Sequence, residues 1–107
     1  MARVDRIRAL LAESPDDPEL HYALAMEHAG TGDDAGCAAV LRAMIERFAA
    51  APFVPAYLQA GQALARLDRT DEAAAVLRDG IAAADRVATP AALHARGEML
   101  GLLATVE

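Results

Sequence analysis

The sequence of 107 residues contains no tryptophan, no lysine and only one cysteine, Cys37. A single thiol excludes an internal disulfide framework and a zinc site built on several cysteines. Aromatic residues make up only 4% of the chain, so large rings contribute little to a core. The chain is nevertheless long enough to bury an apolar core, because 55% of its residues are hydrophobic.

Positive charge is also scarce, since 16 acidic residues face 10 arginines and the formal net charge is -6. Nucleic acids and anionic membranes attract basic patches, so this balance argues against both as the main partner. Charged residues interrupt every long apolar run, which excludes a membrane-spanning helix. Residues 1–11 lack the apolar centre of a signal peptide because arginines and an aspartate interrupt them, so a cytoplasmic protein is expected.

Alanine, leucine, arginine and acidic residues dominate the chain, and β-branched residues are few. This composition favours helices, and no segment alternates long enough between apolar and polar residues to indicate a strand. Prolines, glycines and aspartates divide the chain into short helices. The predicted fold class is all-α, with helices at residues 3–13, 18–30, 34–48, 54–67, 71–86 and 90–105.

Several of these helix boundaries carry residues that favour capping. An aspartate or threonine precedes the helix and can accept a hydrogen bond from its first free amides, and proline follows two of these residues directly. The acid pairs Asp16–Asp17 and Asp33–Asp34 are therefore interpreted as helix caps and not as catalytic carboxylates. The predicted N-caps are Asp17, Asp33 or Asp34, Thr70 and Thr89. Short loops between these helices make successive helices antiparallel neighbours.

The chain repeats itself with an offset of 36 residues, which is the spacing from Pro18 to Val54 and from Val54 to Pro90. The second and third predicted helices superimpose on the fourth and fifth, so that Leu41 falls on Leu77. Self-similarity on this scale is typical of solenoids, in which each pair of helices packs on the next. The chain therefore divides into a half repeat, two full repeats and a second half repeat.

The clearest copy of the repeat runs from Tyr57 to Leu77. Gly61, Leu64 and Ala73 lie between these two, which produces the order aromatic, small, large, small, large. Small residues let paired helices approach closely, and large residues fill the gap between pairs. This order resembles the tetratricopeptide repeat, a helix-turn-helix unit of about 34 residues. The earlier copy offers His21, Leu24, Ala25, His28, Cys37 and Leu41 at the corresponding positions.

The resemblance implies one domain over residues 1–107, in which antiparallel helix-turn-helix repeats form a right-handed superhelix. It also implies a protein-protein interaction module without catalytic activity or a cofactor. In proteins similar to this one, the first helix of each repeat lines a concave groove that binds a peptide or a helix. The predicted units are a half repeat at 3–15, repeats at 18–52 and 54–86, and a half repeat at 90–105.

The groove positions of the family, carried over to this sequence, predict a partner-binding surface of mixed and mildly apolar character. This surface lacks the lysine and asparagine set with which chaperone-tail-binding members of the family hold a terminal carboxylate, so that role is disfavoured. The predicted groove residues are Glu19, Tyr22, Met26, Ala29, Leu58, Gln62, Ala65, Arg66, His94, Glu98 and Gly101.

The last predicted helix has apolar residues on two sides, although a solenoid normally ends in a helix with a polar outer face. One stripe is expected to pack on the preceding helices and consists of Leu93, Gly97, Leu100 and Ala104. The other stripe has no following helix to cover it. An alternative function is therefore a homodimer, or a contact with a partner, through Ala95, Met99, Leu102 and Val106. A partly disordered C-terminus would explain the pattern equally well.

Residues that could support other chemistry are few. Cys37 lies at a small-residue position of the repeat, which indicates a buried, inert thiol. His21 and His28 project from one helix face, and His94 and Glu98 are one turn apart, as metal ligands could be. Packing and a solvated ion pair explain these residues better, so a small metal-binding protein is a third and less favoured hypothesis. No phosphate-binding loop or Ser/His/Asp set indicates an enzyme.

Overall fold

The computed structural model describes residues 2–107 and contains six helices, with no strand among the described residues. The predicted all-α class is therefore confirmed. The predicted boundaries hold to within one residue, and the longest helix extends by one residue at each end. The helices are α1 (Arg3–Glu13), α2 (Pro18–Gly30), α3 (Asp34–Arg47), α4 (Val54–Arg66), α5 (Thr70–Val87) and α6 (Pro90–Val106).

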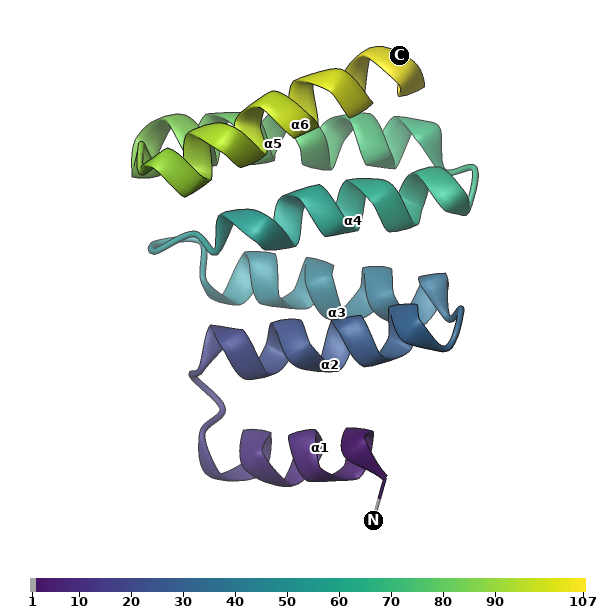
Figure 1. Cartoon of the computed structure of the whole chain (residues 1–107), viewed down its shortest axis with the longest axis vertical. Helices are drawn as coiled ribbons and strands as arrows, with labels where there is room; N and C mark the ends of the chain where they lie inside the picture. The colour runs from purple at the N-terminus through teal and green to yellow at the C-terminus, as the bar shows by residue number, and fades with distance from the viewer. Residues whose placement is uncertain (1) are drawn as a thin grey trace.

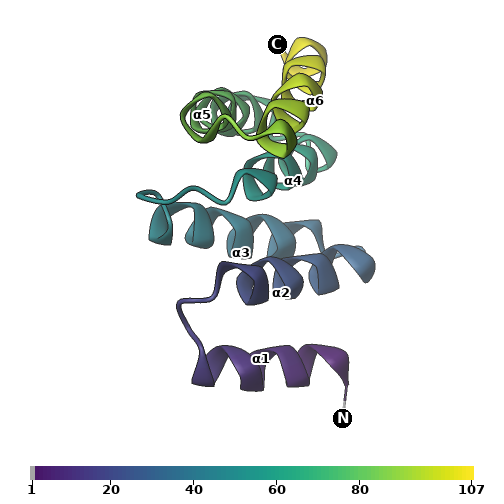
Figure 2. The same cartoon turned by 60° about the vertical axis from the view of Figure 1, so that its left-hand side comes forward.

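The helices stack in chain order into an elongated body of 41 × 29 × 20 Å, with α1 at one end and α6 at the other (Figure 1). Successive helices run antiparallel. Figure 2 shows α2, α4 and α6 displaced to one side of the stack and α3 and α5 to the other. The central helix α4 packs against α3, α5 and α6, whereas α1 packs mainly against α2. No helix of residues 2–107 has the length and apolar character needed to cross a membrane.

Most of the predicted helix caps are present. Asp17 accepts a hydrogen bond from the amide of Glu19, Asp33 from that of Gly36 and Thr89 from that of Ala92. The prediction for Thr70 is wrong, because α5 already includes this residue and begins after Arg69, without a side-chain cap. The first turn of α5 is instead joined to Arg69 by the carboxylate of Glu72, which also accepts from Arg42 of α3.

The core consists of two connected clusters of buried side chains. The first joins α2, α3 and α4 around Ala25, Cys37 and Leu41, and the second joins α4, α5 and α6 around Leu77 and Met99. Cys37 is 1% exposed, in agreement with its interpretation as a small spacer in the packing.

Close helix contacts depend on glycine at two positions. A Cβ atom on Gly61 would collide with the side chain of Leu77. The close approach of α4 and α5 at this point therefore requires glycine. A Cβ atom on Gly80 would lie 2.5 Å from the sulfur of Met99 and 2.5 Å from Cβ of Tyr57. The second contact anchors α6, because it seats Met99 in the crevice between α4 and α5.

Candidate partner-binding surface

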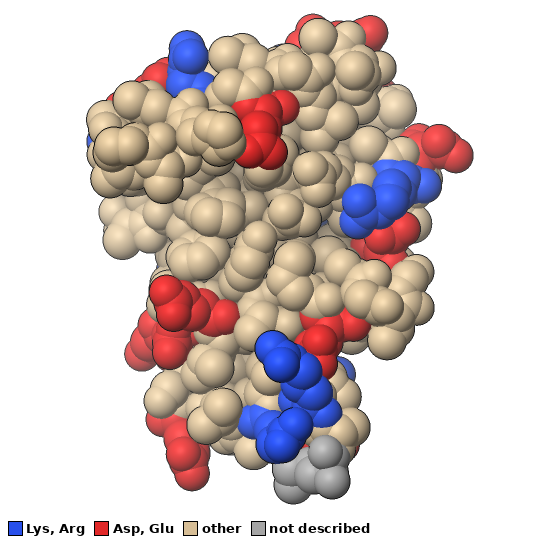
Figure 3. Space-filling view, viewed as in Figure 1, with Lys and Arg blue, Asp and Glu red and all other residues tan. Residues whose placement is uncertain are grey.

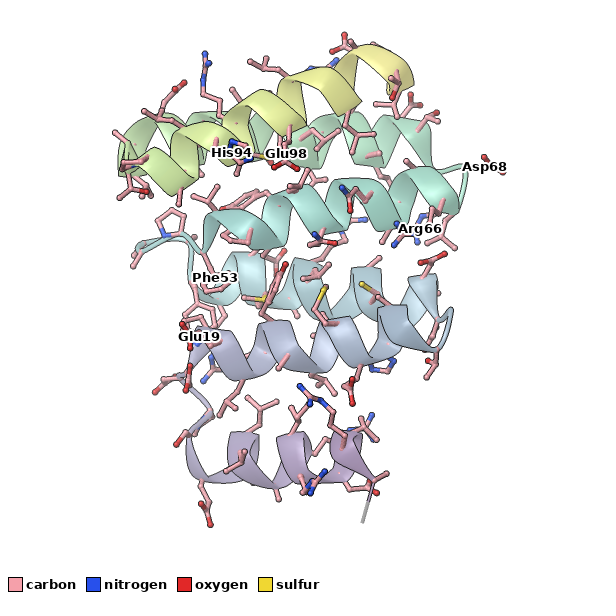
Figure 4. The ribbon with its side chains drawn as sticks, in the orientation of Figure 1. Glu19, Phe53, Arg66, Asp68, His94 and Glu98 are labelled. Carbon is pink, nitrogen blue, oxygen red and sulfur yellow. The ribbon has the colours of Figure 1, made fainter. Side chains whose placement is uncertain are left out.

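The predicted binding residues lie on the side of the stack formed by α2, α4 and α6. In Figure 3, which views this side, the middle of the surface is mostly uncharged and the charged side chains gather toward its margins. Figure 4 shows Glu19, Arg66, His94 and Glu98 projecting from three different helices around this region. The stacking of alternate helices thus brings residues that are far apart in the sequence, such as Glu19 and Glu98, onto one face.

The contribution of α2 is an aromatic and apolar strip beside one carboxylate. Glu19 is exposed in the first turn of the helix. Tyr22 is half-buried, and its ring lies 5.2 Å from that of Phe53, which directly precedes α4. Met26 and Ala29 are also half-buried against the first core cluster. This part of the face offers partly exposed apolar groups that the neighbouring helix already holds in place.

Helix α4 contributes differently from what the sequence predicts. Leu58 is only 8% exposed and packs in the second core cluster beneath α6, so its prediction as a surface contact is wrong. Gln62 and Ala65 are half-buried. Arg66 is exposed, and its Nε donates to a carboxylate oxygen of Asp34 at 2.8 Å. The arginine is therefore held toward α3 by an ion pair.

Helix α6 places a second ion pair on the same face. Nε2 of His94 lies 3.0 Å from the carboxylate of Glu98, and both side chains are at least half exposed. Gly101, one turn further on, is also exposed. The pair therefore places one carboxylate and one imidazole beside each other on the exposed side of α6.

Burial acts on the two titratable groups nearest the apolar part of this surface. Burial raises the pKa of the Tyr22 hydroxyl, while the side chain of Gln59 acts in the opposite direction. Burial also raises the pKa of the Cys37 thiol, which keeps it protonated and unreactive. Neither group is therefore set up for acid-base or nucleophilic chemistry at neutral pH.

The histidines of α2 have separate partners. Nε2 of His21 lies 2.7 Å from the carbonyl oxygen of Pro15, and the ring packs edge-on against Phe48. Nδ1 of His28 lies 3.0 Å from the carboxylate of Asp33, which also caps α3. Among residues 2–107, no three His, Cys, Asp or Glu side chains come together as a metal site would require.

The orientation of α6 overturns the predicted dimer surface. Met99 is fully buried, and Ala95, Leu102 and Val106 pack against the same core cluster. This stripe faces α4 and α5, and its central residue Met99 is not available to a second molecule. The opposite stripe faces outward, with Leu93 48% and Leu100 43% exposed. The two predicted roles are exchanged, because Met99 is the side chain that fits over Gly80.

The sequence-based prediction did not include a hollow at the edge of this surface. A hollow of about 210 Å³ lies where the α3–α4 and α5–α6 loops meet, and it is lined mainly by apolar side chains. Antiparallel helices place alternate loops at the same end of the stack, so the prolines of both loops could have indicated this neighbourhood. The lining residues are Pro52, Phe53, Val54, Pro55, Val87, Thr89, Ala91 and Ala92.

Known proteins resemble this chain in structure. A tetratricopeptide repeat domain protein from Salinibacter ruber, in its NMR structure, has a TM-score of 0.75 and 29% sequence identity, over 87% of this chain and 89% of that one. A crystal structure of a tetratricopeptide repeat domain protein from the same organism has a TM-score of 0.74 and 27% identity, over 85% and 96% of the two chains. No family model and no curated protein matches the sequence.

Proposed function

We propose that this chain, a tetratricopeptide-repeat-like protein by its fold, binds a peptide or a helix of another protein along the face of α2, α4 and α6. The observation that carries the proposal is the composition of this face. Its helices carry the half-buried side chains of Tyr22, Met26 and Gln62. The middle of the face is mostly uncharged, and charged side chains lie toward its margins (Figure 3). Partly buried anchors within a polar rim are typical of protein interfaces. The proposed role requires neither catalysis nor a cofactor.

The charges on this face favour a basic partner. Glu19 has no ion-pair partner among the described residues, and the only partner of Glu98 is a histidine. The positive charge of Arg66 is offset by Asp34, at 2.8 Å. With a net charge of -6 for the whole chain, the field attracts cations. We therefore expect the bound segment to combine apolar residues with flanking lysine or arginine. A cytoplasmic location stays a prediction from the sequence.

Random peptides selected by display on the immobilised protein test this proposal. Selected peptides should bind in fluorescence anisotropy, and Gln62→Arg should weaken them by at least about tenfold, because it fills the middle of the face. The matched control is Ala75→Arg, at an exposed position of α5 on the other side of the stack, which should leave affinity unchanged. Failure to select any peptide, or equal binding by both variants, would contradict the proposed site.

A second experiment examines the chemistry of the partner separately. Glu19→Gln combined with Glu98→Gln removes two carboxylates from exposed positions, so the fold should be unaffected. Basic peptides should then bind severalfold more weakly, and their affinity should depend less on salt concentration. If the double variant binds them as the parent does, the expected preference of this face for a basic partner is wrong, whereas the location of the site is decided by the first experiment.

Self-association remains a second candidate function, with a different contact from the one that the sequence predicts. The observation that favours it is the exposure of two leucines, Leu93 and Leu100, on the outward side of α6.

A further inference from the structure

The outward side of α6 carries an apolar stripe that no described helix covers. Leu93 and Leu100 are 48% and 43% exposed, although Met99 of the same helix is fully buried. Gly97 and Gly101 lie between and beside them, and a Cβ atom on either glycine would meet nothing within 4 Å. Ala104 continues the stripe and is exposed. The surface therefore alternates projecting leucines with small residues.

The 36-residue repeat shows what this stripe corresponds to inside the stack. Three residues of the stripe occupy the positions of Tyr57, Gly61 and Leu64 in α4, namely Leu93, Gly97 and Leu100. The three residues of α4 are buried, and the side chain of Leu77 from the next helix covers Gly61. The stripe on α6 thus has the pattern of small and large residues that in α4 receives another helix.

The stripe is complementary to itself when two copies of α6 run antiparallel. In the register that places Leu100 opposite Gly97 of the second copy, Leu93 lies opposite Ala104 of the second copy. Twofold symmetry then creates the same two contacts again, so every leucine faces a small residue. This arrangement reproduces on both sides the seating of Leu77 over Gly61.

The charges around the stripe are compatible with the same antiparallel arrangement. Antiparallel packing brings the positive end of one helix dipole to the negative end of the other. The first turn of α6 contains no acidic residue and its last turn no basic one, so no side chain of these turns offsets the dipole. Exposed Arg86 near the start of α6 adds a positive charge to that end of the helix. Two ion pairs, Asp85–Arg96 and Arg78–Glu107, join α5 to α6 and bring no net charge.

We propose that the chain forms a symmetric homodimer in which the stripes of two α6 helices, made of Leu93, Gly97, Leu100, Gly101 and Ala104, pack antiparallel against each other. The occupant of the stripe is a second copy of this chain. Gly101 belongs both to this stripe and to the predicted groove residues, so the proposed dimer contact adjoins the proposed peptide-binding face.

Sedimentation velocity on the full chain, from about 5 µM to about 500 µM, measures this association. The parent protein should change from monomer to dimer across this range. Leu100→Glu places a charge inside the contact and should raise the dissociation constant by at least about tenfold. Leu10→Glu is the matched control, because Leu10 is 50% exposed on α1 at the other end of the stack, and it should dimerise as the parent does.

Gly97→Leu removes any ambiguity from misfolding. The position is open in the monomer, and leucine favours a helix more than glycine does, so the variant should fold with at least the stability of the parent. The added side chain fills the place of Leu100 of the second copy and should abolish the dimer. A parent protein that is monomeric throughout would overturn the proposal, and a dimer that survives this substitution would show that the contact lies elsewhere and overturn it too.

Cross-linking tests the register. A Leu93→Cys/Ala104→Cys double variant should oxidise to a covalent dimer, since opposed positions bring Cα atoms within disulfide distance. The native thiol of Cys37 is buried and should not interfere. Leu10→Cys should remain monomeric under the same conditions. The single variants Leu93→Cys and Ala104→Cys should also remain monomeric, because in the antiparallel register neither cysteine faces its own copy. A covalent dimer formed by either single variant would contradict the antiparallel arrangement.

Discussion

The two ends of the stack differ in how they are attached and in what they present to solvent. Helix α1 has 11 residues, of which only Ile7 is buried. Helix α6 has 17 residues and is anchored by Ala92 and the fully buried Met99. Among the described residues, each of them has a neighbouring helix on one side only. One is held by a single apolar side chain, and the other fits into a crevice between two helices.

The two end helices also differ in the residues that they carry at equivalent positions of the repeat. Asp5 and Arg8 of α1 lie 36 residues before Leu41 and Met44 of α3, which are buried. At these repeat positions α1 therefore carries charges where α3 carries core residues. Helix α6 keeps the apolar pattern on its outward side. The comparison indicates that the outward side of α6, unlike α1, has the pattern that receives a helix inside the stack.

The largest expected effect separates the anchors of the two ends. Met99→Ala should lower the free energy of unfolding by about 2–5 kcal/mol, because it removes a fully buried side chain and leaves a cavity. Ile7→Ala should cost less, toward about 2 kcal/mol, since α1 has few other buried contacts to lose. Urea unfolding followed by circular dichroism measures both. Equal losses would contradict the difference in attachment.

A pair of glycine substitutions sharpens the comparison within the α6 end. Gly80→Ala should destabilise by about 1–3 kcal/mol, because its Cβ atom would press on Met99 and Tyr57 in a packed core. Gly97→Ala should stabilise by up to about 1 kcal/mol, because it adds helix propensity in open space. Thermal unfolding at a concentration where the protein is monomeric provides the measurement. A loss of stability from Gly97→Ala would mean that the outward stripe is not open.

The smallest effect concerns an exposed contact in the middle of the stack, which serves as a reference for both ends. Hydrogen bonds from Arg69 and Arg42 lower the pKa of Glu72 from 4.5 to about 2. Because the folded pKa is the lower one, the stabilisation is complete above pH 4.5 and is lost as the pH falls toward 2. The stability difference between the parent and Glu72→Gln should therefore shrink over this range in urea titrations. A difference that stays constant with pH would contradict the role of these hydrogen bonds.

Much of the architecture was predictable because its signals are local. Asp17, Asp33 and Thr89 cap their helices as expected, since a side-chain acceptor before a helix meets its free amides whatever the rest of the fold does. The prediction for Thr70 failed because α5 begins one residue earlier than expected, after Arg69, whose side chain donates to Glu72 in the first turn. The membership of the α2, α4 and α6 face also followed from the repeat, but the burial of Leu58 did not, since α6 covers it.

The sequence by itself determined the helices, their antiparallel order and the 36-residue repeat, because these depend on capping, spacing and short loops. It could not determine which apolar stripe of α6 is buried, since both stripes have the spacing of a helix face. Only the tertiary structure decided this, at the point where Met99 fills the space that Gly80 leaves beside Tyr57. That one fit turns Leu93 and Leu100 toward solvent, because a helix cannot bury both faces against the same two neighbours.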